Sequence, residues 1–532
     1  MLFPGHQSAL HHLHWRSFDS WGLAYRELSA DELNGAALGW ELVWPRSVRV
    51  HYLLGADAPY GTPTVRVTAP TEARTRWRHI EKDGTACLLA PGQSWMPLLH
   101  PAAIDGVLRA ISRIIELNLR RSGDPPDAVA ARHRWVDSGV HAWSLLNPER
   151  GDSNAVATLL HGRWIIASTR HDLEAWMSHR GMRSEEVVDS VVVHVQDFAE
   201  VPRDARSLDG HARRAVEGGG VAVYVVPTEA GPLLVAVALG PSGVLMRVRV
   251  DRADRRWLHE RGGGGLPAEI SEAHVAIVGC GSLGSGVAEI LARAGVGRLT
   301  LVDPDSLSWD NVARHALGGS AVGRSKASEL ASRLRAHLPT TPRVVGLPHR
   351  WQEVAADRSR ALAANLIVGT MAAWPDDLAL AEWARARDIP LVLGWLEPSA
   401  TAGHAISLRG RCLACHFTPR GRFRRAATQW PDESPIRLAD GCHEHFLPYG
   451  YADVVPIQSS IARLSLEVLT AESAEATHRA LLPSLLAVEA LGARASRDAA
   501  DLQGQLPTTV VWAEHRRGWP VDPGCWHCGG IG

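Results

Sequence analysis

The sequence predicts an α/β fold whose most regular part is a doubly wound sheet in the C-terminal half. Five apolar runs of strand length alternate there with helical patterns, which indicates parallel strands joined by crossover helices. The first run ends in a glycine-rich turn that leads into a helical pattern, as in a nucleotide-binding βα unit. The five predicted strands cover residues 274–279, 298–303, 343–347, 365–370 and 390–395.

Length, composition and charge exclude several classes of protein. The chain has 532 residues, of which 45% are apolar and 21% charged, and its net charge is −1. This length suits about two to four domains, and the balanced charge predicts no nucleic-acid or membrane-surface partner. No apolar run reaches the ~18 residues of a membrane span, and the N-terminus lacks the basic start and apolar core of a secretion signal. We therefore expect a cytoplasmic protein.

The N-terminal region, residues 1–150, is predicted to be a small α+β domain. It opens with a possible amphipathic helix, and three strand-like runs follow at 39–44, 48–54 and 64–70. Apolar residues at helical spacing predict a long helix over 101–120.

The middle region, residues 151–262, is predicted to be a small α+β or β-rich domain, and no chemical motif stands out in it. Its strand-like runs are VVDSVVVHVQDF, VAVYVVP, LLVAVALG and VLMRVRV. The run RGGGGLP at 261–267 predicts a flexible linker to the third domain, residues 268–532. Beyond residue 400 that domain has a helical pattern at 457–472 and a strand pattern at 508–515.

The glycine-rich turn IVGCGSLGSG supplies Gly279, Gly281 and Gly284 between a strand and a helix. Glycines allow backbone amides to approach phosphates, and a helix N-terminus favours their negative charge. Such a motif alone also suits an enzyme that binds NAD or FAD. An enzyme that binds NAD or FAD needs one acid after the second strand to bind the ribose. Here a longer series of polar residues follows that strand. They are Asp303, Asp305, Asn311, Arg314 and Lys326.

This series resembles the ubiquitin-activating superfamily, which includes the ThiF and MoeB adenylyltransferases. The motif of that family reads roughly GxGxxG, then DxD, then NxxR, then a lysine that opens the next helix. The resemblance implies ATP and Mg²⁺ as cofactors and a homodimer as the assembly. It also implies that Asp303 binds the ribose, that Asn311 and Arg314 hold phosphates, and that Lys326 neutralises charge on the α-phosphate. Lys326 is one of only two lysines among 56 basic residues, the other being Lys82.

One position departs from that family. The Mg²⁺-binding acid expected just after the fourth strand is replaced by Met371, in the run GTMAAWPDD. Asp376 or Asp377 could take its place from a shifted loop.

The cysteines suggest a metal site. Cys412 and Cys415 form one CxxC pair, and Cys525 and Cys528 form another. Four thiolates make a tetrahedral Zn²⁺ site, and many adenylyltransferases of this family carry such a pair of motifs. His527 lies inside the second pair and is the weaker candidate ligand. The alternative is redox chemistry at one CxxC, for which no thioredoxin-like context is present.

Two further cysteines, Cys442 and Cys87, are candidate acyl carriers. Cys442 lies in LADGCHEHFLPYGYADVVP, just before a predicted helix. In ubiquitin-activating relatives a loop in this region carries the cysteine that forms a thioester, and His443 and His445 could favour its thiolate. The alternative is an inert loop cysteine or an extra zinc ligand. Cys280, inside the glycine turn, is interpreted as a packing residue.

The stretch HIEKDGTACLLAPGQSWMP resembles ubiquitin-conjugating enzymes, in which a loop with G-x-x-C-L precedes W-x-P. Gly84 would supply the turn and Cys87 would be the thioester cysteine. Trp95 and Pro97 match the later part. The asparagine that usually helps to stabilise the oxyanion is replaced by His79, which can also donate a hydrogen bond.

Together these resemblances predict a fused conjugating and activating enzyme, as found in ubiquitin-like and antiviral operons. It would adenylate the C-terminal glycine of a ubiquitin-like modifier or a cGAS-like nucleotidyltransferase, and pass the acyl group from Cys442 to Cys87 and then to a lysine of a target protein. One alternative is a sulfur-carrier adenylyltransferase of the ThiF type whose N-terminal half only docks. A second alternative is a non-catalytic nucleotide-binding scaffold.

Overall fold

The computed structural model divides the chain into two compact units, residues 1–173 with 184–252 and residues 174–183 with 253–532. The described residues are 6–58, 63–77, 79–81, 83–88, 97–120, 139–183, 186–228, 231–240, 242–260, 267–338, 343–430, 437–438, 445–446, 449–471, 475–483, 485–490, 492–497, 499 and 512–529. Of the helices in these ranges, none has the length and apolarity needed to cross a bilayer.

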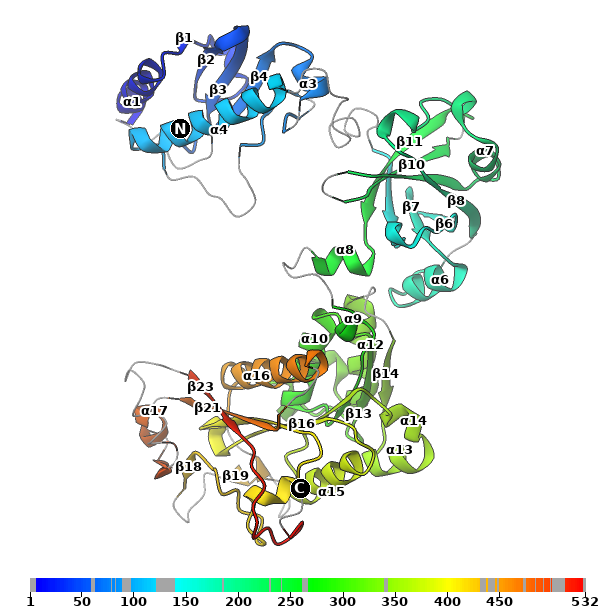
Figure 1. Ribbon diagram of the computed structural model, residues 1–532, viewed down its shortest axis with the longest axis vertical. Coiled ribbons are helices and arrows are strands. Elements are labelled where there is room, and N and C mark those ends of the chain that lie inside the picture. The colour runs from blue at the N-terminus through cyan, green and yellow to red at the C-terminus, as the bar shows by residue number, and fades with distance from the viewer. Residues whose placement is uncertain are drawn as a thin grey trace. The chain divides into compact units, whose positions relative to one another are not determined.

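The N-terminal part is a four-stranded antiparallel sheet in the order β1-β2-β3-β4, with helices on one face (Figure 1). Alternate residues of the central strands point to the two faces of such a sheet. Trp40 and Tyr52 therefore enter one core with Phe18 and Ile104 from the two long helices. The elements are α1 (His6–Ser20), β1 (Ala24–Glu27), α2 (Ala30–Leu33), β2 (Leu38–Trp44), β3 (Val48–Leu54), β4 (Thr64–Ala69), α3 (Ala73–Arg76) and α4 (Pro101–Arg120).

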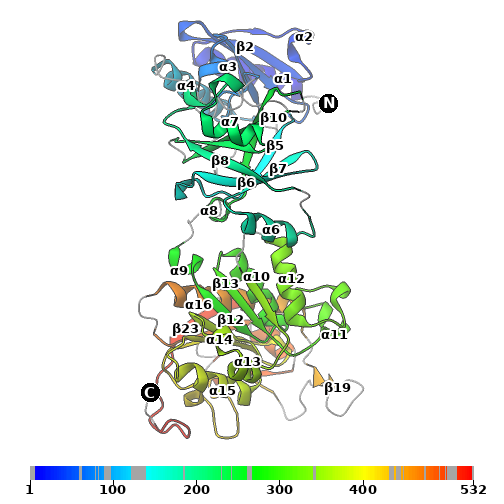
Figure 2. The same ribbon diagram turned by 90° about the vertical axis from the view of Figure 1, so that its right-hand side faces the viewer.

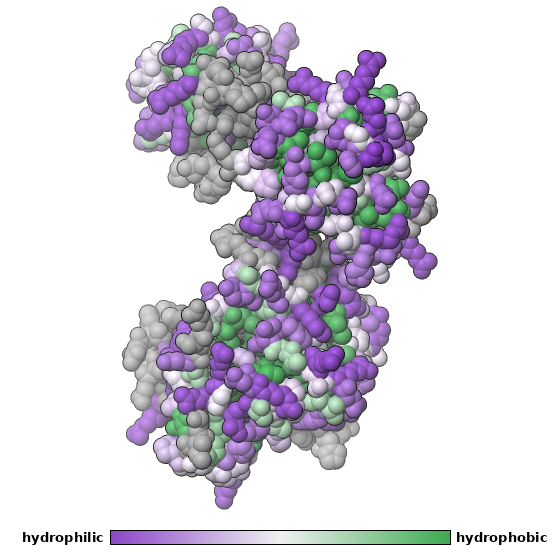
Figure 3. Space-filling model, turned by 45° about the vertical axis from the view of Figure 1, so that its right-hand side comes forward, coloured by the Kyte–Doolittle hydropathy of each residue, from purple (hydrophilic) through white to green (hydrophobic). Residues whose placement is uncertain are grey.

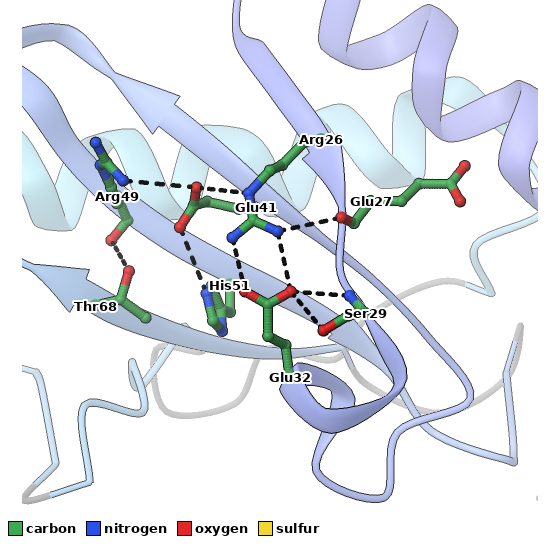
Figure 4. Close-up of polar contacts among 8 residues, drawn as sticks. All are labelled: Arg26, Glu27, Ser29, Glu32, Glu41, Arg49, His51 and Thr68. Carbon is green, nitrogen blue, oxygen red and sulfur yellow. Dashed lines mark hydrogen bonds and ion pairs between the residues drawn. The ribbon is translucent and has the colours of Figure 1, made fainter.

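The opposite face of this sheet is polar, and its contacts centre on Glu41 of β2 (Figure 4). Arg26 of β1 lies 3.1 Å from the Glu41 carboxylate and forms a two-pronged pair with Glu32 at 2.7 and 3.0 Å. Glu32 also closes a capping box with Ser29 at the start of α2. The strand alternation thus separates an aromatic core from an ionic outer face.

The middle part is a closed seven-stranded barrel in the order β10-β11-β5-β7-β6-β8-β9. Small side chains such as Ala142, Ala157 and Ala236 fill its interior, which suits a barrel with few strands. The four strands predicted here are confirmed as β8 to β11. Its elements are β5 (His141–Ser144), β6 (Asn154–Leu160), β7 (Arg163–Ala167), α6 (Arg170–Ser178), β8 (Val188–His194), α7 (Gly210–Glu217), β9 (Val221–Val226), β10 (Leu233–Leu239) and β11 (Leu245–Arg252).

The boundary at residue 150 differs from the structure. β5 precedes that residue, yet it pairs with β7 and β11 of the barrel. Its partners come later in the chain, so the local sequence pattern could not assign β5 to the barrel.

The second unit is built on an eight-stranded sheet in the order β14-β13-β12-β15-β16-β17-β21-β23. The first five of these strands in this order are parallel and confirm the predicted doubly wound sheet. The order reverses between β12 and β15, which is where ligands bind in such sheets. The strands are β12 (His274–Val278), β13 (Arg298–Val302), β14 (Val344–Leu347), β15 (Leu366–Gly369), β16 (Leu391–Leu396), β17 (Gly403–Leu408), β21 (Thr477–Pro483) and β23 (Trp512–Gly518).

Helices pack against both faces of this sheet. Figure 2 shows α10 and α12 near β12 and β13, and α16 packs along α10. The predicted helix 457–472 is confirmed as α16, which starts earlier than expected. The helices are α8 (Arg255–Glu260), α9 (Ala268–Ser271), α10 (Ser282–Arg293), α11 (Trp309–Val312), α12 (Lys326–His337), α13 (Trp351–Asp357), α14 (Ser359–Leu362), α15 (Trp374–Arg385), α16 (Tyr451–Thr470) and α17 (Leu485–Ala490).

Two short antiparallel pairs complete the second unit. They are β18 (Thr428–Gln429) with β22 (Arg494–Ala495), and β19 (Arg437–Leu438) with β20 (His445–Phe446). The face seen in Figure 3 is mostly hydrophilic with small apolar areas.

Candidate functional site

The glycine loop between β12 and α10 leaves space for a ligand at its centre. Gly279 has a φ of +90°, and a Cβ there would lie 3.0 Å from the backbone of Thr370. A Cβ on Gly284 would collide with the Gly279 carbonyl oxygen, whereas one on Gly281 would meet nothing within 4 Å. Gly279 and Gly284 therefore allow the tight turn, and Gly281, the N-cap of α10, lies where a phosphate could approach the helix N-terminus.

Asp303, at the end of β13, holds this loop from the side. Its carboxylate accepts the Cys280 N–H at 2.6 Å through Oδ2 and the Asp305 N–H at 2.8 Å through Oδ1. The side chain is buried, and burial raises the pKa of Asp303 while the two amides and the charge of Lys326 act in the opposite direction. Each carboxylate oxygen has a second lone pair, so Asp303 can still accept a hydrogen bond from a hydroxyl.

Lys326 opens α12 and faces the same edge of the sheet. Its backbone N–H donates to the Asp305 carbonyl oxygen at 2.9 Å, and its Nζ lies 3.1 Å from the Asp305 carboxylate. The lysine side chain is 11% exposed and that of Asp305 65%. The ammonium is therefore held at the edge of the site by an acid that is itself open to solvent.

Asn311 and Arg314 lie on and just after the short helix α11, and both are half-buried. The Arg314 N–H donates to the Asn311 carbonyl oxygen at 3.0 Å, so one turn carries both residues. The structure thus brings the predicted glycines, Asp303 and Lys326 to the C-terminal ends of β12 and β13, as the sequence order suggested, with α11 in the connection between them.

Two residues that hold the glycine loop were not predicted. Nδ1 of His315 accepts the Leu317 N–H at 3.0 Å, so its Nε2 carries the hydrogen and donates to the Cys280 carbonyl oxygen at 2.6 Å. Burial lowers the pKa of His315, in keeping with a neutral ring. Thr370 donates its hydroxyl to the Gly279 carbonyl oxygen at 2.7 Å. Neither residue belongs to a local sequence motif that marks it.

Asp376 and Asp377, the two acids that could replace the one missing at Met371, differ in burial. Asp377 is only 3% exposed, and burial raises its pKa to about 7. Asp376 accepts a hydrogen bond from Gln352 at 2.5 Å. Within the described residues, no acidic cluster that could hold a metal lies at this end of the sheet. We assign no reaction step to Mg²⁺.

The four cysteines of the two CxxC pairs come together at the C-terminal tail. Their sulfur atoms all lie within 4.8 Å of one another, and those of Cys415 and Cys528 are 3.8 Å apart. A tetrahedral Zn²⁺ site with bonds of ~2.3 Å has sulfur atoms ~3.8 Å apart, so the spacing fits zinc.

The electrostatics of this cysteine cluster also fit a cation. Burial raises the pKa of Cys415 to about 11 and raises that of Cys412, and the neighbouring thiolates add to the shift at Cys412. A bound dication removes this penalty by neutralising the thiolates. His527 lies 3.7 Å from the Cys412 sulfur and remains a weaker candidate than the fourth cysteine.

The Cys87 loop is fixed to β4 by backbone hydrogen bonds. The Cys87 N–H donates to the His79 carbonyl oxygen at 2.8 Å, and the Val67 N–H donates to Gly84 at 2.8 Å. Gly84 has a φ of +91°, and a Cβ there would lie 2.7 Å from the Val67 carbonyl oxygen, so the turn requires glycine. Both Cys87 and His79 are exposed.

Several predicted residues lie outside the described residues. They are Cys442 and His443 of one candidate carrier segment, and Lys82 and Trp95 near the other. Their predicted roles remain predictions.

Comparisons with known proteins agree with the doubly wound unit. Residues 258–463 match the ThiF family. The chain is 27% identical over 238 residues to the ATP-dependent ubiquitin transferase-like protein Cap2 of Pseudomonas aeruginosa, covering 42% of this chain and 41% of that protein. It is 38% identical over 139 residues to the adenylyltransferase and sulfurtransferase MOCS3 of Mus musculus, covering 26% of this chain and 29% of that protein.

The chain therefore spans less than half the length of these two curated relatives. Among solved structures, Escherichia coli MccB aligns with a TM-score of 0.34 at 13% identity, over 51% of this chain and 67% of that chain. The matched range contains the glycine loop, Asp303, Arg314 and Lys326. Residues 258–463 of this chain are a ThiF-family domain.

Proposed function

We propose that the chain is a fused activating and conjugating enzyme that joins a small protein modifier to an amine of a target protein. Its ThiF-family domain would use ATP to adenylate the C-terminal glycine of a ubiquitin-like or cGAS-like protein. The observation that carries this proposal is the convergence of the glycine loop, Asp303 and Lys326 at one edge of the sheet. A relative named ATP-dependent ubiquitin transferase-like supports the choice of substrate.

In the adenylation step a carboxylate oxygen of the modifier attacks the α-phosphorus of ATP, and pyrophosphate leaves. The charge that builds on the phosphates calls for fixed positive groups. The ammonium of Lys326 would serve the α-phosphate, and the N-terminus of α10 with Arg314 would hold the others. Asp303, fixed by two amides, would accept a ribose hydroxyl.

In the transfer steps the acyl group moves from oxygen to sulfur and then to nitrogen. The thiolate of Cys442 attacks the acyl carbon and AMP leaves, after which the thiolate of Cys87 displaces the Cys442 sulfur. A lysine amine of the target then attacks the Cys87 thioester, an amide forms and the thiol is released. The exposure of Cys87 on a loop fixed to β4 supports its place as the last carrier, with His79 as a candidate oxyanion donor.

The remaining features have supporting roles in this proposal. Zn²⁺ bound by Cys412, Cys415, Cys525 and Cys528 would fix the C-terminal tail to the ThiF-family domain. Homodimerisation and a cytoplasmic location are expected on the family resemblance and on the sequence pattern, respectively.

The rival function is adenylation of a sulfur-carrier protein, favoured by the match to MOCS3. In that case the N-terminal region would only dock the carrier, and Cys87 would have no role in the chemistry.

The test of adenylation is ATP–pyrophosphate exchange by the full chain with magnesium and candidate proteins that end in glycine. We expect Lys326→Ala to lower exchange by about two orders of magnitude, as removal of a group that stabilises transition-state charge does. The matched control is Lys82→Ala, the other lysine of the chain, which should leave exchange unchanged. Equal exchange in the wild type and Lys326→Ala would refute the assignment of this site.

A further inference from the structure

Tyr449, two residues before α16, and Gln458, within that helix, both contact Ser282 at the start of α10. The Tyr449 hydroxyl lies 3.0 Å from the Ser282 hydroxyl, and Gln458 Nε2 donates to the Ser282 carbonyl oxygen at 2.7 Å. Ser282 is the first residue of α10 and follows Gly281 directly. α16 therefore holds the residue next to the open position of the glycine loop.

The same tyrosine contacts Arg314. The guanidinium carbon lies 4.7 Å from the centre of the Tyr449 ring. A cation over the face of an aromatic ring is attracted by it, and the guanidinium keeps its N–H donors in its own plane. The ring thus holds the guanidinium in place, while its N–H groups remain able to donate to phosphate oxygens. Among the described residues, no acceptor bonds these N–H groups.

Burial shows that these contacts are built into the packing. Gln458 is 2% exposed, and a Cβ on Gly286 would collide with its side chain, so α10 and α16 meet closely there. Tyr449 is half-buried and packs against the central core of the ThiF-family domain. Side chains at so close a contact have little room to turn away.

We propose that Tyr449 is a positioning residue of the nucleotide site, which orients Arg314 and Ser282 toward the phosphates before ATP binds. The inference rests on the proposed function, in which Arg314 contacts phosphate. It adds a residue that lies 135 positions after Arg314, in the segment of Cys442, to which the sequence analysis assigned no role at the nucleotide site. Tyr449 acts on phosphate-binding groups alone. Its replacement should therefore weaken the binding of ATP and leave the binding of adenosine unchanged.

The test is the affinity of the full chain for ATP and for adenosine, measured by competition with a fluorescent ATP analogue. Tyr449→Leu keeps an apolar side chain but loses both contacts, so ATP affinity should fall about tenfold or more. Tyr449→Phe keeps the ring under Arg314, so its ATP affinity should fall only about threefold. Tyr451→Leu is the matched control, since Tyr451 lies two residues away with 47% exposure, and should bind ATP like the wild type.

A double-variant cycle separates positioning from a general structural role. In an Arg314→Ala background, Tyr449→Leu should weaken ATP binding by much less than tenfold, because the ring has no cation to orient. The inference is overturned if Tyr449→Leu weakens the binding of adenosine as much as the binding of ATP, or if it changes neither affinity. If the wild type itself binds no ATP, the proposed function fails. That result can be told apart from failure of the inference, which concerns only the difference between the wild type and the Tyr449 variants.

Discussion

At the scale of single residues, Asp303 shows how one carboxylate can organise a site. Its two oxygens accept the amides of Cys280 and Asp305, so it fixes both the glycine loop and the segment that leads to Lys326. An amide side chain has only one acceptor oxygen and would leave one of these N–H groups without a partner.

Asp303→Asn should therefore weaken ATP binding and also lower the free energy of unfolding by about 1–3 kcal/mol, the usual cost of an unpaired buried polar group. ATP affinity by calorimetry and a thermal melt measure the two effects. Asp310→Asn, an exposed acid in the first turn of α11, is the matched control and should change neither. Wild-type affinity in Asp303→Asn would contradict the role given to this carboxylate.

The site residues that the sequence predicts are those in short-range motifs. Gly279, Asp303 and Lys326 each follow a strand or open a helix, and parallel strands bring such positions to one edge. His315 and Tyr449 could not be found in this way. His315 bonds a carbonyl 35 residues earlier and Tyr449 contacts Ser282 167 residues earlier. These contacts arise where the residues just after α11 and just before α16 pack against the glycine loop and α10.

At the scale of single elements, α1 is held on the N-terminal sheet by a buried histidine. The His14 ring stacks on Trp40 with 4.9 Å between ring centres, and its Nδ1 lies 2.7 Å from the Leu10 carbonyl oxygen. Burial lowers the pKa of His14 from 6.5 to about 4. The folded state therefore keeps this ring neutral where an unfolded chain would bind a proton.

Docking of α1 should weaken as the pH falls from 6.5 to 4. In this window the unfolded state binds more protons than the folded state, so stability falls as the pH falls, by up to about 3 kcal/mol from this group. Hydrogen exchange of residues 6–20, corrected for the intrinsic rate at each pH, measures the effect. His14→Leu should flatten the dependence, whereas the exposed His12→Leu should not. An equally steep dependence in His14→Leu would refute the assignment.

The C-terminal tail is a second element whose position depends on one cluster. Trp519 and Trp526 donate their indole N–H groups to carbonyl oxygens on either side of Cys415, at 3.2 and 3.0 Å. These bonds place the second CxxC pair beside the first. A metal shared by both pairs would link the tail to the rest of the unit.

We expect one zinc ion per chain by elemental analysis, and its loss on Cys415→Ser together with Cys528→Ser. Structural zinc contributes directly to folding, so the variant should expose residues 512–529 to proteolysis and lower the melting temperature by several degrees. Cys87→Ser, an exposed cysteine of the other unit, is the control and should retain the metal. Full zinc content in the double variant would contradict the site.

A helix or strand can be predicted from the sequence where the elements that it packs against or pairs with are near in the chain. The five parallel strands of the ThiF-family domain were predicted because each carries its own apolar pattern and connecting helix. The closure of the barrel was not predicted, because β11 and β5 pair across about a hundred residues. The antiparallel strands β17 and β21 of the eight-stranded sheet were likewise not predicted.

At the scale of the whole molecule, the two candidate carriers lie on different compact units. Cys87 belongs to the first unit, and Cys442 to the second, where it lies in the residues between β19 and β20. The run RGGGGLP at 261–267 lies between the two cysteines in the sequence. The proposed acyl transfer would therefore pass from one unit to the other.

The central claim is that an acyl group passes from an adenylate to Cys442 and then to Cys87. It is tested by trapping thiol-sensitive adducts of a glycine-terminated candidate modifier on the full chain with ATP, and locating them by mass spectrometry. We predict that Cys442→Ala carries no adduct at Cys87, and that Cys87→Ala accumulates the adduct at Cys442 and forms no conjugate. Conjugates formed by Cys87→Ala, or a charged Cys87 in Cys442→Ala, would contradict the account.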